Sequence, residues 1–213
     1  MPNWVYNTLT IEGSPSSVQK LKEQVSAPFT REHDQWNMET GKMELKEYTY
    51  SNPVFAFWNI IKPTDLATYA LQKDHKADDS SLFAGNNWYD WNVRNWGTKW
   101  DIAVANDEKY SDTQFEWTDN GEAMYHFQTA WSPVTPVITA LSMMYPNLSF
   151  DYEFEEEQGW GAELGFDAGQ VHVLADWDIP ESHAENIEVW GECWKCDNPE
   201  YDDLYDDCPK QDL

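Results

Sequence analysis

Hydrophobic and polar residues alternate along several segments of the chain, and this period of two is typical of β-strands that bury one face. The clearest case is residues 148–155, where Leu148, Phe150, Tyr152 and Phe154 alternate with four polar residues. The same pattern predicts strands at residues 4–11, 100–105, 114–118, 122–130, 160–166 and 170–175. Asp119-Asn120-Gly121 and Asp167-Ala168-Gly169 separate successive strands and suit tight turns.

Apolar residues recur at helical spacing in two other segments. Ser14-Pro15 supplies an N-cap and a first helical residue, and Val18, Leu21 and Val25 then share one helix face. Ser132-Pro133 repeats this start signal ahead of an apolar stripe over residues 134–145, which Pro146 ends. We therefore predict two amphipathic helices.

The order of these elements is strand, helix, strand, strand, helix, strand, with additions. This order predicts a ferredoxin-like α+β plait, an antiparallel sheet with two helices on one face. We interpret residues 26–87 as an insertion of irregular loops, apart from a short predicted helix over residues 64–73. Strand-like alternation stops near Pro180, so the predicted division is a ferredoxin-like domain, residues 1–180, and an acidic tail, residues 181–213.

The charge of the chain is strongly negative. Its 213 residues include 39 Asp and Glu but 13 Lys and Arg, which gives a formal net charge of −26. A generic nucleic-acid-binding protein needs a basic surface to displace counterions from phosphates, so this charge excludes direct binding to nucleic acid and to anionic membranes. The 13 Trp, 11 Tyr and 9 Phe residues supply bulky apolar surface, which argues against a chain without a folded core.

The sequence also indicates where the protein works. The first residues do not have the basic segment followed by an apolar segment that is typical of a secretory signal peptide, so we do not expect secretion. No apolar run reaches the length of about 20 residues that a membrane span needs, so we do not expect a membrane span. Cys193, Cys196 and Cys208 are an odd number of cysteines, which fits a reducing compartment better than a disulfide framework. We therefore expect a cytoplasmic protein.

The cysteines allow three interpretations. Cys193 and Cys196 are spaced as two ligands of one Zn²⁺ ion, and Cys208 with His183 would complete a tetrahedral set. The second is a thioredoxin-like redox pair, although the motif does not open a helix after a strand. The third is three reduced cysteines in an acidic tail. The sequence leaves these alternatives open, and we assign no metal site and no cofactor from it.

An aromatic cluster precedes the second predicted strand. Trp88, Trp91, Trp96 and Trp100 would suit the stacking of bases. The negative charge opposes nucleic acid, and the helix-like spacing of large aromatic residues is typical of a core. We therefore expect these tryptophans to pack against the sheet where the insertion rejoins it.

Paired carboxylates are candidates for catalysis or for a divalent metal ion. Glu153 with Glu155 and Asp176 with Asp178 have the required spacing. With 39 acidic residues such pairs arise by chance, and no phosphate-binding loop or nucleophile elbow accompanies them. We therefore expect a protein without enzymatic activity.

Three blocks of the sequence resemble the YubB ferredoxin-like family, whose members are small proteins of phages and conjugative plasmids. The blocks are MPNWVYNTLTIEG at the start, NNWYDWNVRNWGTKWD over residues 86–101, and FQTAWSPVTPV through LSMMYPNLSFDYEFEE over residues 127–156. The resemblance implies a ferredoxin-like fold, an origin on a mobile element and hence a bacterial host cell. The family has no settled activity, so the resemblance supplies no catalytic residues.

The excess of acidic residues calls for a function, because self-repulsion costs folding free energy. We expect a phage or plasmid inhibitor whose carboxylates imitate phosphates and dock onto a basic nucleic-acid-binding surface of a host defence protein, of the anti-CRISPR or anti-restriction type. The alternative is a non-enzymatic accessory protein of a mobile element that self-associates or binds a phage protein. The expected acidic contacts are Asp151, Glu153, Glu155, Glu156, Glu157, Glu200, Asp202, Asp203, Asp206 and Asp207, and the expected aromatic anchors are Trp190, Trp194, Tyr201 and Tyr205.

Overall fold

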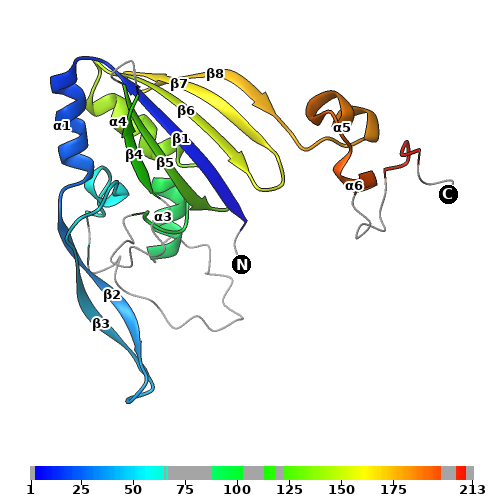
Figure 1. The fold of residues 1–213 in the computed structure, drawn as a ribbon. Helices are drawn as coiled ribbons and strands as arrows, with labels where there is room; N and C mark the ends of the chain where they lie inside the picture. Colours follow the sequence, from blue (N-terminus) through cyan, green and yellow to red (C-terminus); the bar gives the residue numbers. More distant parts are fainter. Residues whose placement is uncertain are drawn as a thin grey trace.

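The computed structural model describes residues 3–64, 66, 88–102, 113–118, 122–197 and 205–209. Its elements follow the predicted order with additions (Figure 1). None of the helices in these ranges is long and apolar enough to cross a membrane. The elements are β1 (Trp4–Glu12), α1 (Pro15–Val25), β2 (Phe29–Asn37), β3 (Lys42–Tyr50), η1 (Phe57–Asn59), α3 (Trp88–Trp96), β4 (Gln114–Trp117), β5 (Ala123–Ala130), α4 (Thr135–Met144), β6 (Ser149–Glu156), β7 (Gly161–Asp167), β8 (Gln170–Trp177), α5 (His183–Trp190) and α6 (Trp194–Asp197).

Six strands form one antiparallel sheet in the order β4-β5-β1-β6-β7-β8. The strands of the predicted motif are β1, β4, β5 and β6, and β1 lies between β5 and β6, which is the strand order of the ferredoxin-like plait. β7 and β8 extend this sheet by a hairpin whose turn residues Ala168 and Gly169 both have positive φ, 47° and 86°. The predicted α+β fold class is therefore confirmed.

The first helix follows the predicted start signal, whereas the second does not. Ser14 caps α1 by accepting a hydrogen bond from the Ser17 backbone N–H, and the apolar face predicted for this helix is fully buried. The prediction that Ser132 caps the second helix is wrong. α4 has Val134 at its N-cap with no side-chain cap, and the Val134 N–H donates instead to the Tyr152 hydroxyl at 2.9 Å.

The interpretation of residues 26–87 as irregular loops is wrong for residues 29–50. These form a separate two-stranded hairpin, β2 with β3, which projects from the rest of the molecule in Figure 1. Phe29 stacks on Tyr50 at its base with ring centroids 4.5 Å apart, and Thr30 and Thr49 share a hydrogen bond. Gly41, with φ of 63°, allows the turn.

Two other predicted elements have different outcomes. Trp100, Asp101 and Ile102 are not in a strand, so the first half of the strand predicted over residues 100–105 is wrong, and its second half lies outside the described residues. Most of the helix predicted over residues 64–73 also lies outside them.

The core lies on one face of the six-stranded sheet. Alternate side chains of β1, β5, β6 and β7 are buried there against α1 and α4, including Leu9, Tyr125 and Tyr152. The expectation that the tryptophan cluster packs against the core holds for three of its four members. Trp96 is fully buried, and Trp88 and Trp91 are partly buried against the core, while Trp100 is 39 % exposed. None of the helices that the structure describes covers the opposite face of the sheet (Figure 1).

Buried polar groups fix how the loops meet the sheet. The Asp101 carboxylate is 2 % exposed and accepts hydrogen bonds from the backbone N–H groups of Phe57 and Trp58, at 2.8 and 2.9 Å, at the start of η1. A carboxylate suits this position because the first N–H groups of a helix have no partner within it. Asp101 thus holds the segment after the β2–β3 hairpin against the core.

Candidate binding face of the sheet

The face of the sheet that the helices do not cover is acidic. The six strands contain nine Asp and Glu residues and no Lys or Arg. Because side chains alternate along a strand, each inward apolar residue of β6 is followed by an outward acidic one, and Asp151, Glu153 and Glu155 are all exposed. On β7, Glu163 and Asp167 are exposed on the same face. The outward side chains thus form two acidic rows over β6 and β7, and the second is interrupted at Gly165, beside which Leu174 of β8 lies.

The strand register sets the spacing of these carboxylates. Alternate residues of a strand are about 6.7 Å apart, and neighbouring strands lie about 4.8 Å apart. Glu163 is directly opposite Glu153, so two like charges face each other across β6 and β7. Asp151, Glu153, Glu155 and Glu163 form no ion pair with any residue that the structure describes. Their charges are therefore available to a binding partner.

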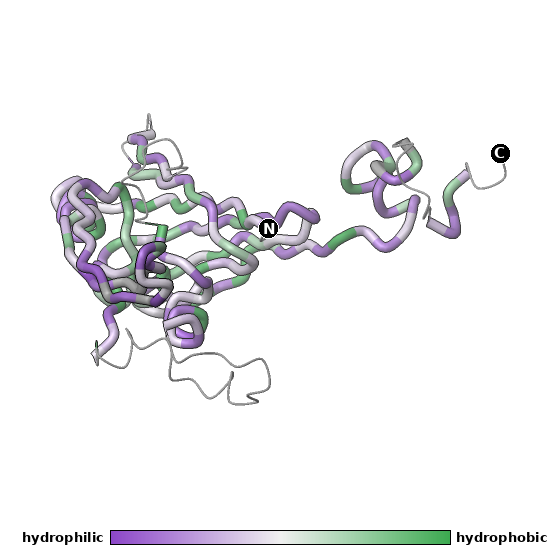
Figure 2. Tube along the Cα trace, turned by 90° about the horizontal axis from the view of Figure 1, so that it is seen from below, coloured by the Kyte–Doolittle hydropathy of each residue, from purple (hydrophilic) through white to green (hydrophobic). Residues whose placement is uncertain are grey.

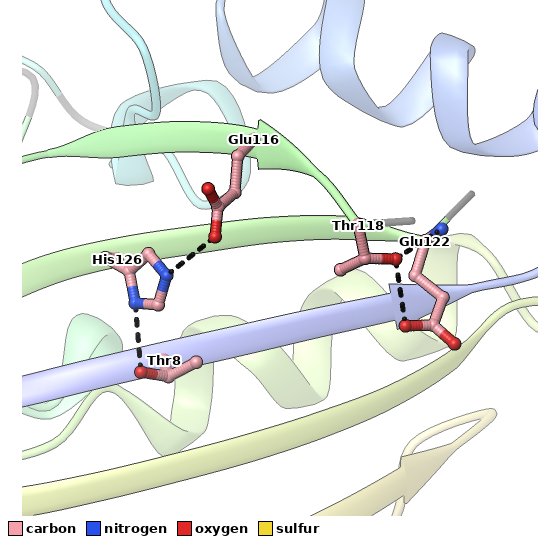
Figure 3. A network of polar contacts seen from close by, with 5 residues as sticks. All are labelled: Thr8, Glu116, Thr118, Glu122 and His126. Carbon is pink, nitrogen blue, oxygen red and sulfur yellow. Dashed lines mark hydrogen bonds and ion pairs between the residues drawn. The ribbon is translucent and has the colours of Figure 1, made fainter. Parts of the chain in front are cut away.

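The other half of this face is polar and nearly uncharged. Tyr6, Thr8 and Thr10 of β1 point away from the helices, and Tyr6 is 51 % exposed and lies opposite Glu155. Next to them, His126 Nδ1 lies 3.1 Å from Thr8 Oγ1, and His126 Nε2 lies 3.5 Å from Glu116 Oε1 (Figure 3).

The contacts in Figure 3 follow from the register of three strands. Thr8 is directly opposite His126 between β1 and β5, and Glu116 is its diagonal neighbour on β4. A hydroxyl, an imidazole and a carboxylate in this order resemble a nucleophile with its base. The long imidazole-to-carboxylate distance and the exposure of both side chains favour instead a surface polar network, which orders this half of the face.

The structure brings together three of the five acids predicted near β6. Asp151, Glu153 and Glu155 share the open face, which is the face of the sheet that the helices do not cover. Glu156 is 3 % exposed and accepts a hydrogen bond from the Gln158 N–H within the β6–β7 turn, so it does not lie on the acidic face with the other three. Glu157 is exposed, and its carboxylate accepts a hydrogen bond from the Trp4 N–H at 2.7 Å.

The predicted C-terminal contacts lie in a different part of the molecule. Both views place α5 and α6 beyond the end of β8, away from the open face of the sheet (Figures 1 and 2). Trp190 is 45 % exposed and Asp206 is exposed. Tyr205 and Asp207 make contacts within this segment, described below. Glu200, Tyr201, Asp202 and Asp203, and the side chain of Trp194, lie outside the described residues.

Sequence reasoning missed Glu163, Asp167 and Tyr6 as members of the face. The signal was present for Glu163 and Tyr6, because alternation within the predicted strands already assigns them to the outward side, whereas Asp167 was assigned to the turn that follows the predicted strand. The same alternation places Glu156 inward, in register with Phe150, Tyr152 and Phe154. The alternate positions of acidic residues within the strands therefore predict which of them share a face better than their clustering along the sequence does.

The cysteines converge at one point of the C-terminal segment. The ligand atoms of His183, Cys193 and Cys196 lie within 4.8 Å of one another. The structure joins Cys196 to Cys208 by a disulfide bond and leaves Cys193 as a buried free thiol. The disulfide in this structure therefore differs from two of the interpretations. It does not join Cys193 to Cys196, as a redox pair would require, and it leaves one cysteine reduced, not three. These residues are the ones in the described part of the chain that could hold a metal ion.

Fold and sequence comparisons agree on the class of protein, an α+β plait of the ferredoxin-like type. Residues 99–197 match the family model described as the ferredoxin-like domain in Api92-like protein. The crystal structure of a protein api92 from Yersinia pseudotuberculosis is similar in fold, with a TM-score of 0.53 and 9 % sequence identity, over 84 % of this chain and 99 % of that chain. No curated protein matches the sequence.

These comparisons support the ferredoxin-like part of the resemblance noted from the sequence. The matched region runs from just after α3 through α6, so it includes the added strands β7 and β8, the helices α5 and α6, and Cys193 and Cys196. The origin on a phage or plasmid stays a prediction.

Proposed function

We propose that this chain is a non-enzymatic binding protein whose acidic sheet face docks onto a basic, nucleic-acid-binding surface of another protein. The observation that carries the proposal is the charge of the open face, since five acidic residues of β6 and β7 are exposed on it and the six strands contain no Lys or Arg. A host defence protein such as a nuclease is the expected partner, because its nucleic-acid groove would accept carboxylates in place of phosphates. The activity of the partner would then be inhibited by competition.

The density of charge on the face supports this imitation of a nucleic acid. One strand of a DNA duplex carries a phosphate about every 3.4 Å along the helix axis. The β6 row carries a carboxylate about every 6.7 Å, roughly half of that density, and Glu163 and Asp167 add a second row beside it. Gly165 lies between Glu163 and Asp167, so the second row has a carboxylate about every 13 Å, and the two rows together reach roughly three quarters of the charge per length of one nucleic-acid strand.

The polar half of the face suits a contact that is not purely ionic. Tyr6 is half-exposed at the border of the acidic rows, between the strands that carry Gln128 and Glu155. Tyrosine is enriched among the residues that dominate binding energy at interfaces, and rim charges mainly accelerate association. We expect Tyr6 to anchor the complex and the carboxylates to set its association rate.

The test uses charge reversal with a matched control. The full chain is immobilised to capture its partner from host lysate at low salt, and the captured protein is then purified. Glu153→Lys and Glu163→Lys should together weaken binding by more than about 10-fold and lower the association rate, because each reverses a charge on the open face. Glu23→Lys, at an exposed position of α1, makes the same change of charge away from this face.

Three results together would support the proposal: competition by DNA or RNA, weakening of the complex as salt rises, and a control that binds normally. If Glu23→Lys weakens binding as much as the open-face variants, net charge alone acts and the docking face is refuted. A partner with no affinity for nucleic acid would refute the imitation. Asp202→Lys with Asp203→Lys tests separately whether the acidic tail contributes.

Self-association is the second candidate function, and the edge strand β8 favours it. β8 has no neighbour on its outer side among the described strands, and Val173 and Leu174 on it are 66 % and 55 % exposed. An exposed edge strand with apolar side chains is a template for pairing with another chain. If this edge pairs, the chain should be a dimer by light scattering and Val173→Lys should make it a monomer, whereas a monomeric parent protein would exclude this function.

A further inference from the structure

The C-terminal segment, residues 180–209, has almost no apolar core of its own. Asn186 is the one buried residue of α5, and the other buried residues described in this segment are Pro180, Cys193, Cys196 and Cys208. So little buried apolar surface cannot hold together α5, the short helix α6 and the turn at residues 205–209. Asn186 also has a buried side-chain oxygen without a hydrogen-bond partner among the described residues, which costs further stability. Another interaction must hold this segment in shape.

Hydrogen bonds bring the turn at residues 205–209 to the start of α5. The Asp207 carboxylate accepts hydrogen bonds from the His183 and Ala184 N–H groups, at 2.7 and 3.0 Å, and the Tyr205 hydroxyl donates to the Pro180 carbonyl at 2.8 Å. The two backbone hydrogen bonds lower the pKa of the Asp207 carboxyl. Cys208, the residue after Asp207, is thereby brought to the start of α5.

The α5–α6 connection brings the other two cysteines to the same point. Gly191 ends α5 in the left-handed conformation, with φ of 77°, so the chain reverses and Cys193 and Cys196 return toward the start of α5. Cys196 Sγ lies 3.3 Å from His183 Nδ1. The three cysteines pack together as one buried cluster with Tyr205 at its edge.

The geometry matches a tetrahedral metal site. With Zn–S bonds of about 2.3 Å and Zn–N bonds of about 2.05 Å, a tetrahedron separates a sulfur and a nitrogen ligand by about 3.6 Å and two sulfurs by about 3.8 Å. The 3.3 Å between Cys196 Sγ and His183 Nδ1 is close to the first of these values, and the Cys193 Sγ lies within 4.8 Å of both atoms. Cys208 is outside this group of three and adjoins it through Cys196, so its sulfur has to move away from the Cys196 sulfur when zinc binds. A disulfide between Cys196 and Cys208 leaves Cys193 and His183 without a role, whereas a metal ion uses all four side chains.

We propose that His183, Cys193, Cys196 and Cys208 form a structural zinc site that holds α5, α6 and the 205–209 turn together. Two sulfurs cannot be joined in a disulfide and bind zinc as thiolates, so the two states exclude each other. Two equivalents of a small thiol reduce the Cys196–Cys208 bond to two thiols and leave as their own disulfide. Zn²⁺ then replaces one proton on each of the three thiols, while His183 binds as neutral imidazole.

The test uses the full chain, reduced with a phosphine and loaded with zinc chloride. After desalting, elemental analysis should find about one zinc per chain, and cobalt in place of zinc should give the visible and near-ultraviolet absorption of a tetrahedral thiolate site. Cys193→Ser is the decisive variant, because the disulfide does not involve Cys193. Both Cys193→Ser and His183→Ala should weaken zinc binding by more than about 100-fold, since loss of an outer partner alone costs 10–100-fold.

His172→Ala is the matched control for His183, because His172 is exposed on β8 and should leave zinc binding unchanged. Removal of zinc with a chelator from the reduced protein should expose residues 180–209 to proteolysis while the near-ultraviolet circular dichroism of the sheet domain stays the same. The proposal is overturned if the reduced chain retains no zinc, or if Cys193→Ser and His183→Ala bind zinc as tightly as the parent chain. These measurements do not depend on a binding partner, so they separate this site from the proposed function.

Discussion

Two buried tyrosines in the core should respond in opposite ways to the same substitution. The Tyr152 hydroxyl accepts a hydrogen bond from the Val134 N–H and donates one to the side-chain oxygen of Asn7, which is itself 3 % exposed. The Tyr125 hydroxyl is equally deep but has no hydrogen-bond partner among the described residues. Burial raises the pKa of both hydroxyls, so both are neutral near pH 7.

The expected cost follows from the groups left unpaired. Tyr152→Phe keeps the ring and leaves a buried N–H and a buried amide oxygen without partners, each of which costs about 1–3 kcal/mol. We expect a loss of about 2–4 kcal/mol in the free energy of unfolding, which for a chain of this size lowers Tm by about 5–15 °C. Tyr125→Phe removes an unsatisfied group and keeps the contacts of the ring with Phe55 and Phe115, so it should be neutral or slightly stabilising.

Urea unfolding followed by tryptophan fluorescence and by circular dichroism measures both variants. Tyr6→Phe, at a position 51 % exposed on the open face, reports the effect of losing a solvated hydroxyl. Equal losses from Tyr152→Phe and Tyr125→Phe would refute the reasoning, because stability would then follow burial of the hydroxyl and not its hydrogen bonds. A loss below about 0.5 kcal/mol for Tyr152→Phe would do the same.

Three further predictions concern the loops. Asp101→Asn should cost about 2–4 kcal/mol of unfolding free energy in urea, because one of its two acceptor oxygens becomes a donor facing a backbone N–H. Gly97→Ala should cost at least about 2 kcal/mol in the same assay, since φ is 86° and a Cβ would lie 2.6 Å from a backbone oxygen. Hydrogen bonds from Asn37 and then Thr40 lower the pKa of Glu44, so they stabilise the β2–β3 turn above the ordinary pKa and this stabilisation is lost as pH falls through the lowered value. Thr40→Val should move the Glu44 titration, followed by NMR, back toward its ordinary range.

The sequence predicts the elements that bury one face and misses those that do not. Ser14, Val18, Leu21 and Val25 define α1 because capping and a single apolar stripe both point to the same helix. The β2–β3 hairpin was missed because charged residues occur on both of its faces, so neither face gives an apolar period of two. Ser132 misled because α4 begins at Thr135 with the apolar Val134 at its N-cap, and the Val134 N–H finds its partner in the Tyr152 hydroxyl of another element, which the local sequence does not reveal.

The candidate site could be predicted in part for the same reason. Alternation along one strand indicates which acids of β6 share a face, but the sequence does not say which strand lies beside it. The opposition of Glu153 and Glu163 depends on the register of β6 with β7, which the tight turn after Gln158 sets. The cysteine spacing left zinc open as one of three interpretations, and only the packing of Asp207 against the start of α5 brings Cys208 toward the other cysteines.

The opposition of Glu153 and Glu163 provides a test of whether the acidic face is selected for binding. Like charges directly opposite in a sheet destabilise it, by a few tenths of a kcal/mol at an exposed position. Glu163→Gln should therefore raise the free energy of unfolding slightly at low salt, and this gain should fade as salt screens the repulsion. The same variant should bind the partner more weakly. A residue kept at a cost to stability and needed for binding is what a functional surface requires. A Glu163→Gln protein that is less stable would show instead that the carboxylate serves the fold, and a gain in stability that is independent of salt would show that repulsion between the two carboxylates is not the cost.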